Sequence, residues 1–138
     1  PGFSWPAYIQ KSNDESLIIP MAEDFEFADN VDDILSIDGL DAINFGPIDY
    51  SLSANLPIGY KIDHPSLVDA YNKIESKARA KGIGIMCPVV PATQDNARDM
   101  IARGVTMLIL GNDMHHFQSA CKNIMAECVE PLRNAVTG

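Results

Sequence analysis

Four short apolar runs place the strongest limit on how this 138-residue chain can fold. They are Leu17–Met21, Ala42–Phe45, Ile83–Val90 and Val105–Leu110, and three of them are rich in Ile or Val. Polar and apolar residues do not alternate within them. Strands that are buried on both faces have this pattern, as in a parallel sheet covered by helices. The runs therefore predict four buried strands in an α/β fold.

The segments between these runs carry apolar side chains three or four residues apart, which is typical of amphipathic helices. The expected helices cover approximately residues 27–35, 67–78, 93–103 and 116–136. Thr93 is a suitable N-cap, Asp63-His64-Pro65 indicates a helix start, and Lys81-Gly82 indicates a helix stop. Strand and helix thus alternate four times, which predicts right-handed βαβ units.

Four βα units within a single domain, residues 1–138, can form two architectures. One is a small open sheet, and the other is one half of a (β/α)8 barrel, whose usual length is about 250 residues. The chain length favours the open sheet. The absence of an initial Met and the residues at the strand ends favour the half barrel. The connection 50–62 is expected to be a long loop, and loops of that length are often functional.

Acidic residues follow two neighbouring strands of the predicted sheet. Glu23 and Asp24 come directly after the first run, and Asp49 follows the second. The carboxyl ends of parallel strands carry the site in α/β folds, so two carboxylates there could reach one hard cation. Magnesium or manganese suits such a pair, and zinc fits less well because no His or Cys accompanies it. The alternative is structural, with Glu23 and Asp24 complementing a helix dipole and Asp49 capping a Gly-Pro turn.

Five motifs spread over nearly the whole chain form a recognisable set. They are Tyr8-Ile9-Gln10-Lys11-Ser12-Asn13-Asp14, Ile18-Ile19-Pro20-Met21-Ala22-Glu23, Asp29-Asn30-Val31-Asp32-Asp33-Ile34-Leu35, Gly46-Pro47-Ile48-Asp49 and Gly111-Asn112-Asp113. In order and spacing they resemble the HpcH/HpaI aldolase family of class II, metal-dependent pyruvate aldolases, and most of all its 4-hydroxy-2-oxoheptanedioate aldolases. The set is specific because Glu23 and Asp49 flank the third motif at an interval of 26 residues.

The resemblance implies the C-terminal half of a (β/α)8 barrel in which a Glu and an Asp at successive strand ends bind a divalent metal. Mg²⁺ or Mn²⁺ is expected, with Co²⁺ as a further option. These ligand roles fall on Glu23 and Asp49. The resemblance also implies that pyruvate chelates the metal and that backbone N–H groups of Ile48 and Asp49, in the turn begun by Gly46 and Pro47, hold its carboxylate.

The implied reaction is aldol cleavage or formation of 4-hydroxy-2-oxo acids, which gives pyruvate and an aldehyde through a metal-stabilised pyruvate enolate. The family also uses an Arg and a His from early barrel strands. We expect both upstream, because the four arginines of this chain lie on predicted helices, so activity would require the N-terminal half. Met21 is another departure, since close relatives often carry a Gln facing the substrate, and a thioether cannot donate a hydrogen bond.

Two rival hypotheses remain. A related lyase on the same scaffold would act on citryl or malyl thioesters, or would decarboxylate its substrate in the manner of macrophomate synthase. Thioester enzymes need a nucleotide-binding groove, and no basic cluster for one is visible. A non-catalytic half-barrel module serving assembly would bind neither manganese nor pyruvate.

Composition limits the partners and the compartment. A formal net charge of −9 repels nucleic acids and anionic lipid surfaces, and no apolar run approaches the roughly 20 residues needed to cross a bilayer. The three cysteines include no Cys-x-x-Cys pair, which argues against a disulfide framework. We therefore expect a cytoplasmic protein, and the resemblance implies a homo-oligomer that exchanges its last helix. Cys121 and Cys128 fall on an apolar face of that helix, which is expected to pack in the core or in an interface.

Other reactive side chains have simpler interpretations. His115 and His116 are adjacent at a helix start, so they should point in different directions, with one facing solvent. His64 is expected to be a helix-start residue, with contact to the aldehyde as the alternative. Cys87 lies in a predicted strand, and nothing in the sequence provides a base to activate it.

Overall fold

The structure is a computed structural model that describes residues 2–59 and 61–137, with side chains through residue 133. Its centre is a four-stranded sheet in the order β1 (Met21–Ala22), β2 (Ala42–Phe45), β3 (Gly84–Pro88) and β4 (Met107–Ile109). All three strand pairs are parallel. The predicted α/β fold with sequential parallel strands is confirmed.

The first strand is shorter than the sequence predicted. Leu17 and Ile18 are more than half exposed, and only Met21–Ala22 forms a ladder with β2. Ile18 still bonds to Asp41, donating its N–H to the Asp41 carboxylate at 2.7 Å and accepting from the Asp41 N–H at 3.0 Å. Pro20 lies between these bonds and β1 and has no N–H to donate, so the ladder is interrupted there.

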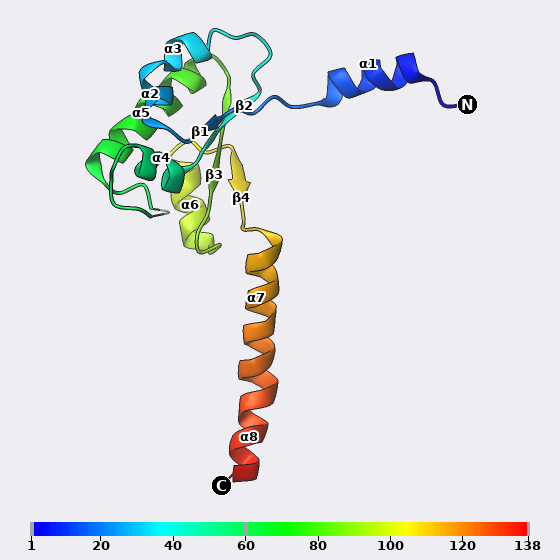
Figure 1. Ribbon diagram of the computed structural model, residues 1–138, viewed down its shortest axis with the longest axis vertical. Coiled ribbons are helices and arrows are strands. Elements are labelled where there is room, and N and C mark those ends of the chain that lie inside the picture. The colour runs from blue at the N-terminus through cyan, green and yellow to red at the C-terminus, as the bar shows by residue number, and fades with distance from the viewer. Residues whose placement is uncertain (1, 60, 138) are drawn as a thin grey trace.

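Five helices accompany the sheet (Figure 1). They are α2 (Phe25–Asp29), α3 (Val31–Ile34), α4 (Pro47–Ser53), α5 (Pro65–Ala80) and α6 (Gln94–Ala102). The single helix expected at 27–35 is two short helices, because Asn30 between them has a non-helical ψ of 15°. The connection expected to be a long loop begins inside α4, whose first residue is Pro47.

The predicted helix boundaries in the second half are confirmed. His64 is the N-cap of α5 and Pro65 its first residue, while Lys81 is the C-cap and Gly82 has a φ of +73°. The Thr93 side chain accepts a hydrogen bond from the Asn96 N–H and caps α6. These residues act through backbone geometry that holds in any tertiary context, which is why they could be identified in advance.

The core lies between the sheet and α5. Its largest fully buried side chains include Phe45, Tyr71, Ile74 and Ile85. The Phe45 ring packs against Tyr71 with centroids 5.3 Å apart and against Tyr50 at 5.5 Å. The Tyr71 hydroxyl donates to the Arg103 carbonyl at 3.0 Å, so the buried phenol is satisfied and ties α5 to the end of α6.

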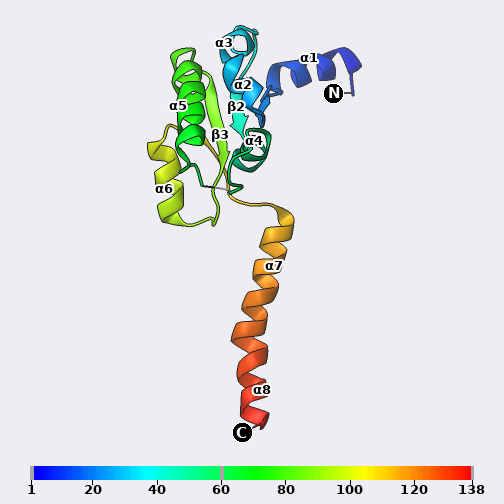
Figure 2. The same ribbon diagram turned by 60° about the vertical axis from the view of Figure 1, so that its left-hand side comes forward.

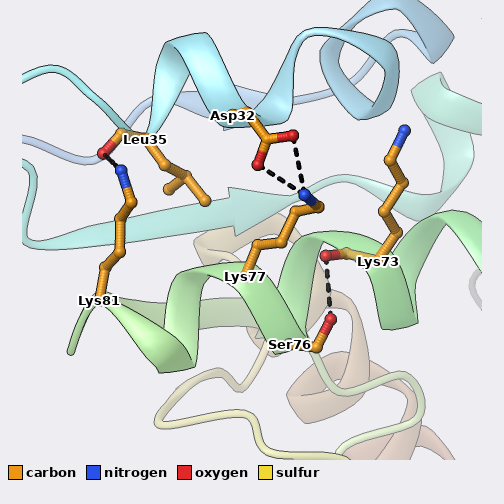
Figure 3. A network of polar contacts seen from close by, with 6 residues as sticks. All are labelled: Asp32, Leu35, Lys73, Ser76, Lys77 and Lys81. Carbon is orange, nitrogen blue, oxygen red and sulfur yellow. Dashed lines mark hydrogen bonds and ion pairs between the residues drawn. The ribbon is translucent and has the colours of Figure 1, made fainter.

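Three lysines, Lys73 and Lys77 on α5 and Lys81 at its C-cap, lie along the side of α5 that is next to α3 (Figure 3). Lys77 donates to the Asp32 carboxylate, at 2.8 Å to one oxygen, and Lys81 donates to the Leu35 carbonyl at 2.7 Å. The hydrogen bond from Lys77, and after it the positive charges of Lys77, Lys73 and Lys81, lower the pKa of Asp32. These contacts fasten the short helix α3 to α5 at the surface of the body.

Two terminal segments project from the body (Figures 1 and 2). They are α1 (Trp5–Glu15) and the stretch formed by α7 (Asp113–Ile124), the π-helical segment η1 (Met125–Val129) and α8 (Glu130–Thr137). Neither α1 nor α7 has a buried residue. No helix in the described part of the chain is long and apolar enough to span a bilayer.

Apolar side chains on these projecting segments lie open to solvent. On α7 and η1, Phe117 is 71% exposed, and Cys121 and Cys128 are exposed too. The expected packing of this face in the core is therefore wrong for this chain, whereas its packing in an interface stays a prediction. Near α1, the Phe3, Trp5 and Tyr8 rings pack on one another with centroids 4.9 to 6.1 Å apart.

Candidate metal and substrate site

The sequence left open whether Glu23 and Asp24 bind a metal or stabilise a helix start, and the structure gives the two residues different positions. Asp24 is the N-cap of α2, and its side chain accepts a hydrogen bond from the Phe27 N–H at 2.7 Å. Glu23 directly follows β1 and forms no hydrogen bond or ion pair with any described residue. The structural interpretation therefore holds for Asp24, and Glu23 remains free to bind a ligand.

Asp49 is placed by a strand-to-helix turn at the end of β2. Gly46 caps α4, Pro47 occupies its first position, and Asp49 lies in its first turn. The N–H groups of Ile48 and Asp49 fall at helix positions that have no carbonyl partner within the helix. The turn therefore supplies a carboxylate and two amide donors within three residues.

The two acidic residues border one cavity at the carboxyl ends of the strands. Its volume is about 360 Å³, which is within the usual range for small-molecule sites. It is lined by Glu23, Asn44, Phe45, Gly46, Pro47, Ile48, Asp49, Pro88 and Ile109. Five of the six residues predicted for the metal and the substrate line this cavity, and Met21 is the one that does not.

Gly46 allows the close approach of Glu23 to the turn. A Cβ atom at this position would lie 2.8 Å from both Cγ and Oε1 of Glu23, closer than real side chains pack. The Gly46 N–H donates to the Ala22 carbonyl at 3.1 Å, which fixes the spacing of the two strand ends. Any larger residue would therefore require the Glu23 side chain to shift.

Asn44 is a site residue that the sequence interpretation missed. Its side chain is 8% exposed, and its Oδ1 has no hydrogen-bond partner among the described residues. A buried amide oxygen without a partner is unfavourable by about 1–3 kcal/mol, so such an oxygen usually serves a ligand or water. The signal was a polar residue inside the otherwise apolar run Ala42–Phe45.

The charges of Glu23 and Asp49 act on each other. Burial, and in second place the negative charge of Asp49, raise the pKa of the Glu23 carboxyl. A cation between the two carboxylates would relieve this repulsion. The donors at the cavity, two carboxylates and an amide oxygen, are the hard ligands that Mg²⁺ and Mn²⁺ prefer. The residues present therefore fit such an ion.

No group of three or more His, Cys, Asp or Glu gathers anywhere in the described residues, so a zinc-type cluster is not formed.

Comparison with known families settles the relationship. The sequence profile of the HpcH/HpaI aldolase/citrate lyase family matches residues 4–120, most of the chain. The chain belongs to this family. Its curated relatives include 5-keto-4-deoxy-D-glucarate aldolases from Enterobacter sp. strain 638, 33% identical over 121 residues, and from Shigella dysenteriae, 34% identical over 119 residues. These matches cover 86% and 85% of the chain but only 45% and 44% of the relatives.

Solved structures of the HpcH/HpaI type share the fold. An HpcH/HpaI aldolase from Desulfitobacterium hafniense superposes with a TM-score of 0.75 at 26% identity, over 94% of this chain and 49% of that one. Macrophomate synthase superposes with a TM-score of 0.77 at 24% identity, over 96% of this chain and 45% of that one. The four-stranded sheet thus corresponds to about half of a (β/α)8 barrel, and the predicted fold class is confirmed.

Met21 lies at the margin of this HpcH/HpaI site. It is 52% exposed and pairs with Asn44 across the β1–β2 ladder. Met21 and Glu23 are two residues apart on an extended segment, so they share one face of the sheet. Contact between Met21 and a substrate stays a prediction.

The arginines of the chain are occupied elsewhere. Arg79, Arg98 and Arg103 pair with acidic residues on their own helices, at 2.9, 3.5 and 2.9 Å. No arginine lines the cavity that holds Glu23. The expectation that an upstream Arg and His complete the HpcH/HpaI site is consistent with this arrangement and remains a prediction.

The remaining candidate residues have clear positions. His64 begins α5, as predicted, and its Nδ1 is buried without a hydrogen-bond partner among the described residues. Cys87 is 1% exposed, and burial raises its pKa to about 12, which makes the thiol a poor nucleophile. His115 and His116 are both exposed and border one small cavity beyond the end of β4, and the divergence of their rings stays a prediction.

Proposed function

We propose that the full-length protein is a metal-dependent aldolase that cleaves or forms 4-hydroxy-2-oxo acids, with pyruvate and an aldehyde as the two fragments. The observation that carries this proposal is the joint placement of Glu23 and Asp49 on one cavity, where burial and then the charge of Asp49 raise the pKa of Glu23. Membership of the HpcH/HpaI family, whose enzymes generally depend on a divalent metal, supports it.

Glu23 and Asp49 would hold the ion, Mg²⁺ or Mn²⁺ in the first instance and Co²⁺ as a further option, with the Asn44 amide oxygen beside them. When bound, the ion supplies Lewis-acid stabilisation of the negative charge that develops as a methyl proton leaves pyruvate. The Ile48 and Asp49 amides orient the pyruvate carboxylate through their N–H groups. Pro88 and Ile109 border the cavity with apolar surface.

The activity belongs to a larger assembly than the described residues. The chain spans less than half the length of the curated relatives it matches. We therefore assign the proton-transferring His and the substrate-orienting Arg to the other half of the barrel. The exposed apolar side chains of α7 fit a subunit interface in a homo-oligomer. Because the relatives include 5-keto-4-deoxy-D-glucarate aldolases, a polar sugar acid is the first substrate to test.

A matched pair of substitutions in the full-length protein tests the ligand assignment. Glu23→Gln removes a proposed ligand, and Glu26→Gln makes the same chemical change at an exposed residue of α2. Calorimetry with Mn²⁺ and deuterium exchange of the pyruvate methyl group are the measurements. We expect Glu23→Gln to weaken Mn²⁺ binding and exchange on the order of 100-fold, and Glu26→Gln to leave both within about twofold. Wild-type exchange in Glu23→Gln would refute the assignment.

A further inference from the structure

Asn44 is a buried polar side chain on the face of the sheet opposite to α5. The next residue, Phe45, packs against Tyr71 of α5, and successive residues of a strand point to opposite faces. Asn44 is only 8% exposed, and it lines the same cavity as Glu23 and Asp49. A buried amide thus shares the cavity with the two carboxylates.

The side chains around Asn44 on this face cannot satisfy its amide oxygen. Its partners in register are Met21 on β1 and Met86 on β3, and a thioether has no hydrogen to donate. Ala42 and Gly46, two residues before and after it, carry no polar side chain. Oδ1 is buried without a hydrogen-bond partner among the described residues. A partner for this oxygen therefore has to come from the cavity or from outside the described residues.

The contents proposed for the cavity narrow the choice to the metal ion. An amide oxygen accepts a hydrogen bond or binds a cation, but it cannot donate. Pyruvate and its enolate carry only acceptor oxygens, and the ionised carboxylates of Glu23 and Asp49 also have no hydrogen to donate. A divalent cation is the group that an amide oxygen beside two carboxylates serves best.

The strand register brings the amide within reach of an ion held by Glu23. Met21 pairs with Asn44, so Glu23 comes level with Gly46, where a Cβ atom would lie 2.8 Å from Glu23 Oε1. Two residues of a strand rise by roughly 6.6 Å. The amide side chain from one level and the carboxylate from the next, each with a metal–oxygen bond of about 2.1 Å, together span this step.

We propose that Asn44 is a third protein ligand of the divalent ion and binds it through Oδ1, in addition to Glu23 and Asp49. The inference rests on the proposed function, because it completes the metal site on which that function depends. A neutral amide adds an oxygen ligand without a third negative charge beside the two carboxylates. Three protein oxygens leave three octahedral positions, two for the carboxylate and keto oxygens of pyruvate and one for water.

Two substitutions of Asn44 and one matched control test the inference in the full-length protein. Asn44→Leu removes the amide oxygen from a side chain of similar shape, Asn44→Asp keeps an oxygen, and Asn72→Leu makes the same change at an exposed residue of α5. Calorimetric titration with Mn²⁺ is the first measurement. We expect Asn44→Leu to weaken binding about tenfold, Asn44→Asp to bind at least as tightly as the wild type, and Asn72→Leu to stay within about twofold.

Electron–nuclear double resonance of the bound Mn²⁺ tests the direct bond. In protein labelled with ¹³C at asparagine, we expect the coupling of a carbon attached to a ligand oxygen. This coupling should be present in the wild type and in Asn72→Leu and lost in Asn44→Asp. Its absence from the wild-type protein would overturn direct binding by Asn44.

Melting temperatures separate a metal ligand from a packing residue. Without metal, Asn44→Leu should melt at the wild-type temperature or above it, because an unsatisfied amide is removed, and it should gain less stability from Mn²⁺. A lower melting temperature without metal, with an unchanged gain from Mn²⁺, would mean that the amide bonds within the barrel and would overturn the inference. Wild-type Mn²⁺ affinity in Asn44→Leu overturns the inference alone, whereas a wild-type protein that binds no Mn²⁺ removes the proposed function as well.

Discussion

The body and the projecting helices contain the same kinds of side chains in opposite environments. Ile74 on α5 is fully buried, whereas Ile124 at the end of α7 is 58% exposed. The helices of the body cover a sheet, but α1 and α7 have nothing of the described chain against their apolar faces. Monomeric proteins rarely leave so many large apolar groups together in solvent. The body is therefore a unit with its own core, whereas a partner for the projecting helices stays a prediction.

The cysteines give the largest contrast between the two regions. At pH 8 the buried Cys87, with its pKa raised by burial to about 12 from 9.0, has about a thousandfold less thiolate than an unshifted thiol. Cys121 and Cys128 on the projecting helix are exposed. We expect a thiol reagent at pH 8 to label these two quickly in the folded protein, unless an oligomer covers them, and to label Cys87 only after unfolding.

The raised pKa of Cys87 also makes the stability of the fold depend on pH. The contribution of the neutral Cys87 thiol to folding is complete below its ordinary pKa of 9.0 and is lost as the pH rises through about 12.

In the labelling experiment, peptide mapping after brief alkylation identifies the cysteines that were labelled. Rapid modification of Cys87 in folded protein would contradict the buried position of β3.

Truncation of a buried and an exposed isoleucine compares the two regions directly. Ile74→Ala should lower the free energy of unfolding by about 2–5 kcal/mol, since it removes buried methyl groups and leaves a cavity. Ile124→Ala should change the stability of the monomer by less than about 0.5 kcal/mol. Urea denaturation measures both. A loss for Ile124→Ala as large as that for Ile74→Ala, and dependent on protein concentration, would show that α7 is buried in an oligomer.

Gly46, which lines the site, and Gly59, which does not, differ in the space available for a side chain. Gly46→Ala would bring a Cβ atom to 2.8 Å from Oε1 of Glu23, whereas at Gly59 the nearest atom would be 4.0 Å away. We expect Gly46→Ala to weaken Mn²⁺ binding roughly 10–100-fold by displacing the carboxylate, and Gly59→Ala to have no measurable effect. Equal affinities in calorimetric titrations would mean that Glu23 is not held against the turn in the way the structure shows.

The sequence predicted those features that depend on local chemistry. β2 was delimited correctly because a continuous apolar run needs both faces covered, and α5 because Pro65 and Gly82 limit the backbone on their own. The Glu23 and Asp49 pair was found from the position of acids after strands, and the cavity brings both together. Helix α4 was missed because its residues lie in a segment rich in turn formers. The structure shows that the helix starts directly after Gly46, which lies against the Glu23 side chain.

Features that depend on tertiary contacts could not be predicted. The last helix has the amphipathic pattern of a core helix, and nothing in that pattern tells whether the partner belongs to the same chain. Asn44 is a single polar residue in a strand, and its role became visible only when the partnerless Oδ1 was placed beside the cavity. The small cavity that His115 and His116 border was also unpredictable, because it forms between the helix start and the segment that follows β3.

The smallest expected effect is at the surface of the body, where α3 is fastened to α5 (Figure 3). The pKa of Asp32 is lowered from its ordinary value of 3.8, first by the hydrogen bond from Lys77. Its stabilising contribution is therefore present above pH 3.8 and is lost as the pH falls through the lower, folded pKa. Because both side chains are partly exposed, Lys77→Met should change the melting temperature only slightly while returning the Asp32 pKa toward its ordinary value. An NMR titration of the Asp32 carboxyl carbon measures this. A lowered pKa that persists in Lys77→Met would assign the shift to the weaker charges of Lys73 and Lys81, and would remove Lys77 from the attachment of α3.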